Sequence, residues 1–278
     1  MFQYYFLYEN QIPSGMGFPF WGKIHISWLV ALTLLGVILV KWYIKTADNR
    51  KPVFEKILVS IMVAMDLYKD IILLVTHHFY AWELPLDLCA LAVYISFLHG
   101  FIHSKTTGEI LFALCFPGAL SALLFPNWNI YPQMNFVNIH SFLIHGLLVI
   151  YPLMLLISGR LKPNIRQYYR VWIFLAVLVP AAMAVNFLLG TDFLFLNLPS
   201  KDSPLVIIYN LTGKTWYLVG FGIFVLAINM IMYIPFIAWD IWKKEHTDKE
   251  HTDKEHTDKE HIDKENIDKE NIDKENNR

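Results

Sequence analysis

Seven long apolar stretches limit what this chain can fold into more than any other feature of its sequence. They lie at residues 24–43, 54–75, 84–102, 109–125, 138–158, 171–189 and 216–237. Each is close to the roughly 20 residues that an α-helix needs to cross a bilayer. Residues 29–40 and 57–65 lack the alternation of apolar and polar residues that marks strands of a membrane β-barrel. The predicted fold class is therefore an all-α membrane protein, a bundle of seven transmembrane helices.

The composition excludes an ordinary soluble domain. Hydrophobic residues make up 55% of the 278 residues and charged residues 17%, whereas about a quarter of a soluble domain is charged. The charge is also uneven, since twelve of the 24 acidic residues lie in residues 246–278. No basic face remains for nucleic acid. We therefore expect contact with membrane lipids, no nucleic-acid binding, no cofactor and no metal, while the sequence does not identify protein partners.

The distribution of lysine and arginine predicts the orientation. The first, third and fifth connections between stretches carry ten of them, whereas the other side carries Lys23, Lys201 and Lys214. Because positive residues remain on the cytoplasmic side, we place the N-terminus outside and the C-terminus inside. The predicted location is the plasma membrane, which the chain crosses several times.

Three regions follow from this topology. Residues 1–23 are aromatic and polar, which is typical of a segment at the outer membrane interface. Residues 24–240 form the seven-helix membrane domain. Residues 241–278 form a cytoplasmic tail with a pentapeptide repeat that starts His-Thr-Asp-Lys-Glu at residue 246. Because the tail has almost nothing to bury, we predict that it is disordered, or transiently helical through Glu–Lys pairs four residues apart.

Polar and ionisable residues gather at one depth of the predicted bundle, in its outer-leaflet half. Such residues are costly inside a membrane, which makes them candidates for a functional site. The candidates for contact with a substrate, or for support of catalytic residues, are Asp66, Lys69, Asp70, Asp87, Asn138, Ser141 and Asn186. Two blander interpretations stay open: polar groups often serve as packing contacts between helices, and Asp66, Lys69 and Asp70 can form a self-neutralising structural group.

Cys89 and His145 are the predicted catalytic pair. With a rise of about 1.5 Å per residue, the two lie within about 3 Å of each other in depth, on two different helices. An imidazole beside a thiol removes its proton, and the thiolate then attacks an acyl carbonyl to form a thioester. Asn186, Ser141 or free backbone N–H groups at the start of the third helix would donate to the oxyanion.

The same arithmetic separates the second cysteine from this pair. Cys115 lies about 16 Å below the outer end of its helix, so we expect it to be out of reach of Cys89 and expect no disulfide. Asp87 lies about 200° around the helix from Cys89. We therefore expect Asp87 to pair with Lys69 rather than with the thiol.

Several short motifs resemble those of one family. They are Leu-Pro-Leu-Asp-Leu-Cys at residues 84–89, Pro-Gly-Ala-Leu at 117–120, His-Gly at 145–146, Asn-Phe-Leu-Leu-Gly-Thr-Asp-Phe-Leu-Phe-Leu at 186–196 and Trp-Tyr at 216–217. Over roughly residues 20–240 the chain resembles the YwaF-like bacterial integral membrane proteins and their animal relative, transmembrane protein 164. The resemblance implies acyl transfer on phospholipids, with Cys89 and His145 at the positions of the family's Cys and His. Asp87 and Asp192-Phe193 depart from the residues common in bacterial members, which leaves the substrate open.

Two alternatives from other functional classes stay open. A transporter or receptor would bind an ion or small solute at an outward-facing cavity. Its ligands would be Asp66, Lys69, Asp70 and Asp87. A membrane zinc hydrolase would take its ligands from His77, His78, His140 and His145. Zinc usually needs three protein ligands in fixed geometry, and His140 and His145 diverge on a helix, so this alternative is the weaker one.

Overall fold

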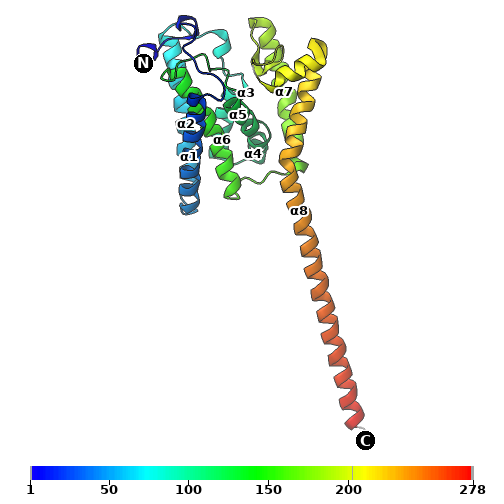
Figure 1. Ribbon diagram of the computed structural model, residues 1–278. Helices are drawn as coiled ribbons and strands as arrows, with labels where there is room; N and C mark the ends of the chain where they lie inside the picture. Colours follow the sequence, from blue (N-terminus) through cyan, green and yellow to red (C-terminus); the bar gives the residue numbers. More distant parts are fainter. Residues whose placement is uncertain (1, 202, 277–278) are drawn as a thin grey trace. The chain divides into compact units, whose positions relative to one another are not determined.

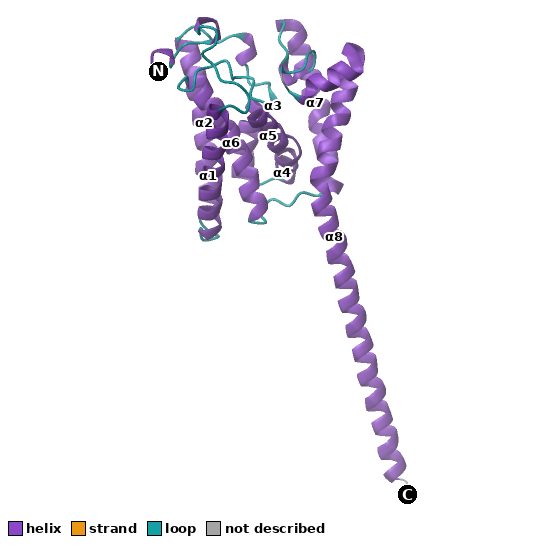
Figure 2. Ribbon diagram, in the orientation of Figure 1, coloured by secondary structure: helices purple, strands orange, loops and turns teal. Residues whose placement is uncertain are grey.

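The computed structural model describes residues 2–201 and 203–276. It consists of helices, turns and loops, with no strand among these residues (Figure 2). The predicted all-α fold class is thus confirmed. The chain divides into two compact units, Met1–Met230 and Ile231–Arg278, and each unit is considered by itself.

The helices of the first unit are joined by short turns and loops. The α-helices are α1 (Lys23–Lys45), α2 (Lys51–Val75), α3 (Leu88–Ile102), α4 (Lys105–Ile110), α5 (Phe116–Leu124), α6 (Phe136–Ile157), α7 (Tyr169–Leu189) and α8 (Pro204–Asn276), which continues into the second unit. The shorter helical segments are the π-helical η4 (Leu111–Cys115) and the 3-10 turns η1 (Phe2–Tyr4), η2 (Glu9–Gln11), η3 (Ala81–Glu83), η5 (Ile165–Gln167) and η6 (Phe193–Phe195). We call the end at which α1, α3 and α6 begin the upper end, and the opposite end the lower end (Figure 1).

Among the residues that the structure describes, six helical segments are long and apolar enough to cross a membrane, so the chain is a multi-pass membrane protein. They are Lys23–Lys45, Ala81–Ile102, Lys105–Leu124, Phe136–Ile157, Ile165–Leu189 and Pro204–Lys244. Helix α2 has 25 residues, or about 37 Å of helix, but its charged residues keep it outside this set. The count of seven spans therefore stays a prediction, as does the orientation.

Two helices begin at other residues than the apolar stretches suggest. The third stretch starts at residue 84, but Pro85 disfavours the helical conformation of the residue before it, and α3 begins at Leu88. The fourth stretch starts at residue 109, whereas α4 already begins at Lys105. The Ser104 side chain accepts a hydrogen bond from the Thr107 backbone N–H and so caps α4.

Helix α8 is longer than the predicted seventh span at both ends. It begins at Pro204 and has a break at Gly213, whose φ of 69° and ψ of 172° suit glycine. It then runs to Asn276 and crosses residues 240–241, the predicted start of the tail, without interruption. The backbone is therefore helical where the sequence predicts disorder or a transient helix. Glu–Lys pairs four residues apart favour this conformation.

Helix α6 lies at the centre of the packing, because it contacts α1, α2, α3 and α5. A Cβ atom on Gly146 of α6 would lie 2.5 Å from Leu32 Cδ2 in α1, and one on Gly100 of α3 would lie 2.8 Å from Val59 Cγ2 in α2. Such close approach between helices is typical of membrane bundles, where small residues stand at the contacts. Away from the core, side chains such as Phe187 in α7 are 89% exposed, as expected for a surface that faces lipid.

The N-terminal segment packs on the upper end of the bundle. The Phe136 backbone N–H donates to the Tyr5 carbonyl at 3.0 Å. The Asn135 side-chain amide donates to the carbonyls of Tyr4 and Leu7 at 2.9 and 2.8 Å. These contacts tie the segment to the start of α6. The interfacial role of residues 1–23 stays a prediction.

Candidate functional site

Cys89 lies in the first turn of α3 and is half-buried. Residues 89, 93, 96 and 100 share one face of a helix, and Val93, Ser96 and Gly100 on that face are buried. The N-cap residue Asp87 makes no side-chain hydrogen bond to the helix. Cys89 therefore stands at the upper end of a buried stripe, beside backbone N–H groups that no side chain caps.

Cys115 lies nearer to Cys89 than the depth arithmetic predicts. It is the last residue of η4, which packs against α3. The large difference in depth that the arithmetic predicts is therefore not found. The ends of the apolar stretches are not level, since Leu88 at the start of α3 packs beside Gly118, which is less than one turn beyond Cys115. Both cysteines are free thiols.

His145 has one ring nitrogen tied to the backbone. Its Nδ1 lies 2.7 Å from the Ser141 carbonyl oxygen. Because a carbonyl only accepts, Nδ1 carries the hydrogen and Nε2 keeps its lone pair in the neutral ring. The ring also stacks on Trp128, with 4.8 Å between centroids and an interplanar angle of 20°. The imidazole is thus held in one tautomer and one orientation.

Cys89 and His145 stand on neighbouring helices, because α3 contacts α6. No hydrogen bond joins the two described side chains. Asn138 and Ser141 share the His145 face of α6. Asn138 donates its Nδ2 to the Gln133 carbonyl at 2.9 Å, and its buried Oδ1 has no hydrogen-bond partner among the described residues.

A second group of polar side chains joins α2 to η3 and to the N-terminal segment. Lys69 Nζ lies 3.3 Å from Asp70 Oδ1 and 3.5 Å from Glu83 Oε2. Glu83 also accepts a hydrogen bond of 2.5 Å from the Tyr8 hydroxyl, whose oxygen accepts the Trp82 indole N–H at 3.0 Å. Burial, followed by the hydrogen bond to Glu83, raises the pKa of Tyr8. The hydroxyl therefore stays a donor at neutral pH. Sequence reasoning missed Glu83 and Tyr8 because both lie outside the long apolar stretches.

Asp66 is buried below Lys69 on α2 and faces two other helices. Its Oδ2 accepts a hydrogen bond of 3.2 Å from the Tyr94 hydroxyl of α3. Its Oδ1 lies 3.8 Å from Nε2 of His140 in α6, and that buried nitrogen has no hydrogen-bond partner in the described chain. We call these residues the polar cluster: Asp66, Lys69, Asp70, Glu83, Tyr94 and His140.

Asp87 and Asn186 hold the loop that follows α7. Asp87 Oδ1 accepts the Leu194 backbone N–H at 3.0 Å. Asn186 Oδ1 accepts the Phe193 backbone N–H at 2.8 Å, and its Nδ2 donates to the Phe193 carbonyl at 3.1 Å. These bonds hold Leu194 at a φ of 62°, which is unfavourable for leucine. The expected pair of Asp87 with Lys69 is not formed, because the Asp87 carboxylate binds this loop.

The lower end contains a buried cluster that sequence reasoning does not reveal. Glu55 of α2 is fully buried. Its Oε2 lies 2.5 Å from His103 Nε2, and its Oε1 lies 2.7 Å from Arg160 Nε and also accepts a hydrogen bond from the Tyr43 hydroxyl. These partners come from α1, the end of α3 and the loop after α6. From the sequence, Arg160 serves only to predict the orientation of the chain in the membrane.

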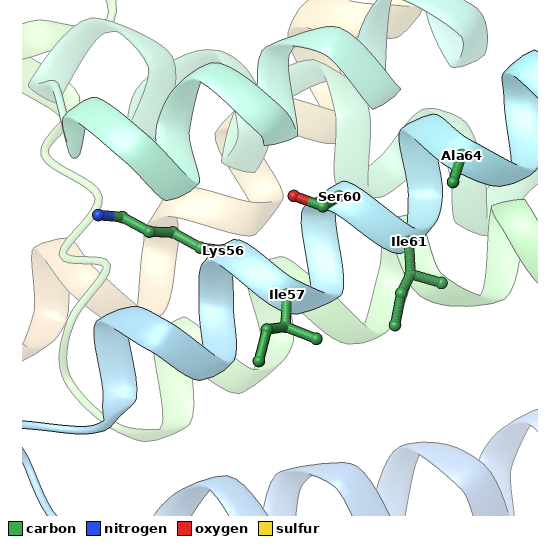
Figure 3. A pocket seen from close by; sticks show the side chains of 5 residues that line it. All are labelled: Lys56, Ile57, Ser60, Ile61 and Ala64. Carbon is green, nitrogen blue, oxygen red and sulfur yellow. The ribbon is translucent and has the colours of Figure 1, made fainter.

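Two surface grooves lie away from the predicted site residues. One, of about 370 Å³, runs along α2 and is lined by Lys56, Ile57, Ser60, Ile61 and Ala64. Figure 3 shows Lys56 and Ser60 on one side of the helix, with Ile57 and Ile61 on the other. The second groove, of about 580 Å³, is lined by the N-terminal segment and by Asn129 and Ile130. Neither lining contains a catalytic pair.

The histidines of the zinc alternative do not come together. The His78 ring stacks on Tyr8 with 5.2 Å between centroids, whereas His140 faces Asp66 and His145 stacks on Trp128. Within the part of the chain that the structure describes, no three His, Cys, Asp or Glu side chains are arranged to hold a metal ion. The zinc hydrolase is not proposed further.

Comparison with curated proteins finds no match, and comparison with solved structures finds none either. The family described as the TMEM164 family matches residues 20–233. This range is more than half of the chain, and it includes Cys89, His145 and the whole polar cluster. The match agrees with the motifs that resemble this family. The chain therefore belongs to the TMEM164 family.

Proposed function

We propose that this protein transfers or hydrolyses the acyl groups of membrane phospholipids through Cys89 and His145. The six apolar segments among the described residues fit a bundle in contact with such lipids. The observation that carries the proposal is the fixed ring of His145. Because Nδ1 is bound to the Ser141 carbonyl, the Nε2 lone pair is the one available to take a proton from a thiol.

The proposed reaction has two halves. His145 Nε2 takes the thiol proton, and Cys89 Sγ attacks the carbonyl carbon of a phospholipid ester. The ester C–O bond breaks, and the imidazolium returns the proton to the leaving alkoxide, which departs as a lysophospholipid. The acyl group remains on Cys89 as a thioester. The hydroxyl of a second lipid, or water, then gives its proton to His145 and takes the acyl group, and the departing thiolate recovers the proton.

We assign the oxyanion to the backbone N–H groups at the start of α3. Asp87 binds Leu194 instead of capping the helix, so these groups stay available beside the Cys89 thiol. Asn186, one of the donors predicted from the sequence, already uses its amide on the Phe193 backbone. We therefore expect Asp87 and Asn186 to support the site by holding the loop after α7.

Lipid turnover by the purified full-length protein in nanodiscs tests this proposal. The substrate is a phospholipid with an isotope-labelled acyl chain, and the products are resolved by mass spectrometry. Cys89→Ala should abolish turnover, and His145→Gln should lower it by about 10²–10⁴-fold. Cys115→Ala is the matched control and should keep turnover, since it removes the neighbouring thiol alone. Turnover that survives Cys89→Ala would reject the mechanism.

A second candidate function is the binding of an ion or small solute by a transporter or receptor. The observation that favours it is the polar cluster, which gathers the buried Asp66 and the partly buried Asp70 and Glu83 against α3 and α6. Alkylation of Cys89 separates the two candidates. A binding protein keeps solute-dependent tryptophan fluorescence after alkylation, whereas the proposed enzyme loses lipid turnover.

A further inference from the structure

Two members of the polar cluster face each other across a gap. Asp66 Oδ1 and His140 Nε2 are 3.8 Å apart, and their side chains are only 6% and 10% exposed. The distance is too long for a hydrogen bond. His140 Nε2 has no hydrogen-bond partner in the described chain. A buried polar atom without a hydrogen-bond partner costs free energy. A ligand that binds both atoms would remove this cost.

The charge around the gap is negative. The titratable groups that face it are Asp66, Lys69 and Asp70 on α2, Glu83 on η3, Tyr94 on α3, and His140 and His145 on α6. Lys69 is the ammonium group among them, and it stands between Asp70 and Glu83. Asp66 thus has no lysine or arginine in contact with it among the described side chains. Because an unpaired carboxylate is unfavourable in an apolar interior, one added positive charge would stabilise this place.

The ligand atoms decide which cation fits. The gap has one carboxylate oxygen and one imidazole nitrogen, since the other oxygen of Asp66 is taken by the Tyr94 hydroxyl. Calcium and magnesium ions need about six oxygen ligands, and zinc needs about four ligands. A proton needs only a donor and an acceptor. The chemistry of this pair therefore fits a proton.

We propose that Asp66 and His140 form a proton-binding site between α2 and α6. One proton resides on either Asp66 Oδ1 or His140 Nε2, so that the pair carries no net charge whichever atom holds it. This inference rests on the second candidate function, because it names the proton as the bound ion. It does not depend on acyl transfer at Cys89 and His145.

Spectroscopy of the full-length protein in nanodiscs tests the site between about pH 5 and 9. At neutral pH we expect one of two signals. Either the infrared carbonyl band of a protonated carboxyl disappears in Asp66→Asn, or an imidazolium ¹⁵N resonance disappears in His140→Gln. The signal should titrate as one proton, so that the ratio of occupied to empty sites changes tenfold per pH unit. If Asp66→Asn does not fold, His140→Gln and the infrared band of the wild type still decide the question.

Two control variants lie outside the polar cluster. His77→Gln and Asp48→Asn change exposed side chains and should leave the signal of the wild type in place. An ionised Asp66 beside a neutral His140 over the whole pH range would overturn the proposal. A signal that depends on exchange of potassium for sodium or choline would assign the site to a metal ion and also overturn it.

The same samples separate this inference from the proposed functions. Cys89→Ala should keep the proton signal whether or not lipid turnover occurs. Absence of solute-dependent tryptophan fluorescence in the wild type would count against the second candidate function, while the proton signal is read independently of it.

Discussion

Replacing Arg160 by alanine should destabilise the first unit, because it breaks the buried cluster around Glu55. Glu55 has no solvent exposure, and Arg160 and His103 lie 2.7 and 2.5 Å from its oxygens. Removing one partner of a buried ion pair costs about 3–5 kcal/mol, since the remaining charge has neither water nor a counter-ion. The Arg160 side chain is 29% exposed and His103 remains, so we expect the lower value, about 3 kcal/mol. For a domain of this size the loss corresponds to a fall of about 6–12 °C in melting temperature.

The measurement is thermal unfolding of the purified protein in detergent, followed by tryptophan fluorescence. Arg166→Ala is the matched control, because Arg166 is exposed in the same loop and should change stability by less than about 0.5 kcal/mol. The double variant Glu55→Gln with Arg160→Ala removes both charges and should recover most of the loss. Equal melting temperatures of Arg160→Ala and Arg166→Ala would refute the reasoning. A double variant that is no more stable than Arg160→Ala would refute it as well.

Two further predictions concern packing and pH. Gly146→Ala should lower the free energy of unfolding by about 1–3 kcal/mol through overpacking, because its Cβ would lie 2.5 Å from Leu32 Cδ2. Gly222→Ala is the control, because a Cβ there would have no neighbour within 4 Å. Equal melting temperatures of the two variants would contradict this prediction. The pKa of Tyr8 is raised above its ordinary value of 10.0, so the contribution of this phenol to stability is present below that pH and is lost as the pH rises beyond it. The melting temperature, followed by tryptophan fluorescence, should therefore fall as the pH rises above about 10, and Tyr8→Phe should make this fall smaller; an equal fall in Tyr8→Phe would disprove the assignment.

The helices could be predicted from the sequence because hydropathy belongs to each segment by itself. Residues 138–158 predict a span, and α6 covers Phe136–Ile157. The ends were less predictable, since they depend on individual residues. Pro85 delays the start of α3, Ser104 caps α4 early, and Gly213 interrupts α8. The length of α2 is sufficient for a membrane span, whereas its charged residues disfavour one, so the seventh span could not be settled from hydropathy.

The site residues were predictable by type but not by partner. An imidazole and a thiol inside apolar helices stand out in any sequence, which is why Cys89 and His145 could be named as candidates. The tie of His145 to Trp128 was not, because these two rings lie on different elements. Asp87 was expected beside Lys69 and instead binds the Leu194 backbone. In the sequence Glu55 is an ordinary charged residue near the start of a helix, and only the fold shows that it pairs with Arg160.

The sequence alone determined that this chain is an all-helical membrane protein of the TMEM164 family with polar residues inside its apolar helices. Only the tertiary structure decided which of those residues meet: Asp66 with His140, and Glu55 with Arg160. The physical reason is that burial of apolar surface depends on the composition of each segment. A polar contact depends on the rotation and depth of two helices at once, and a shift of one turn moves a side chain by about 5.4 Å.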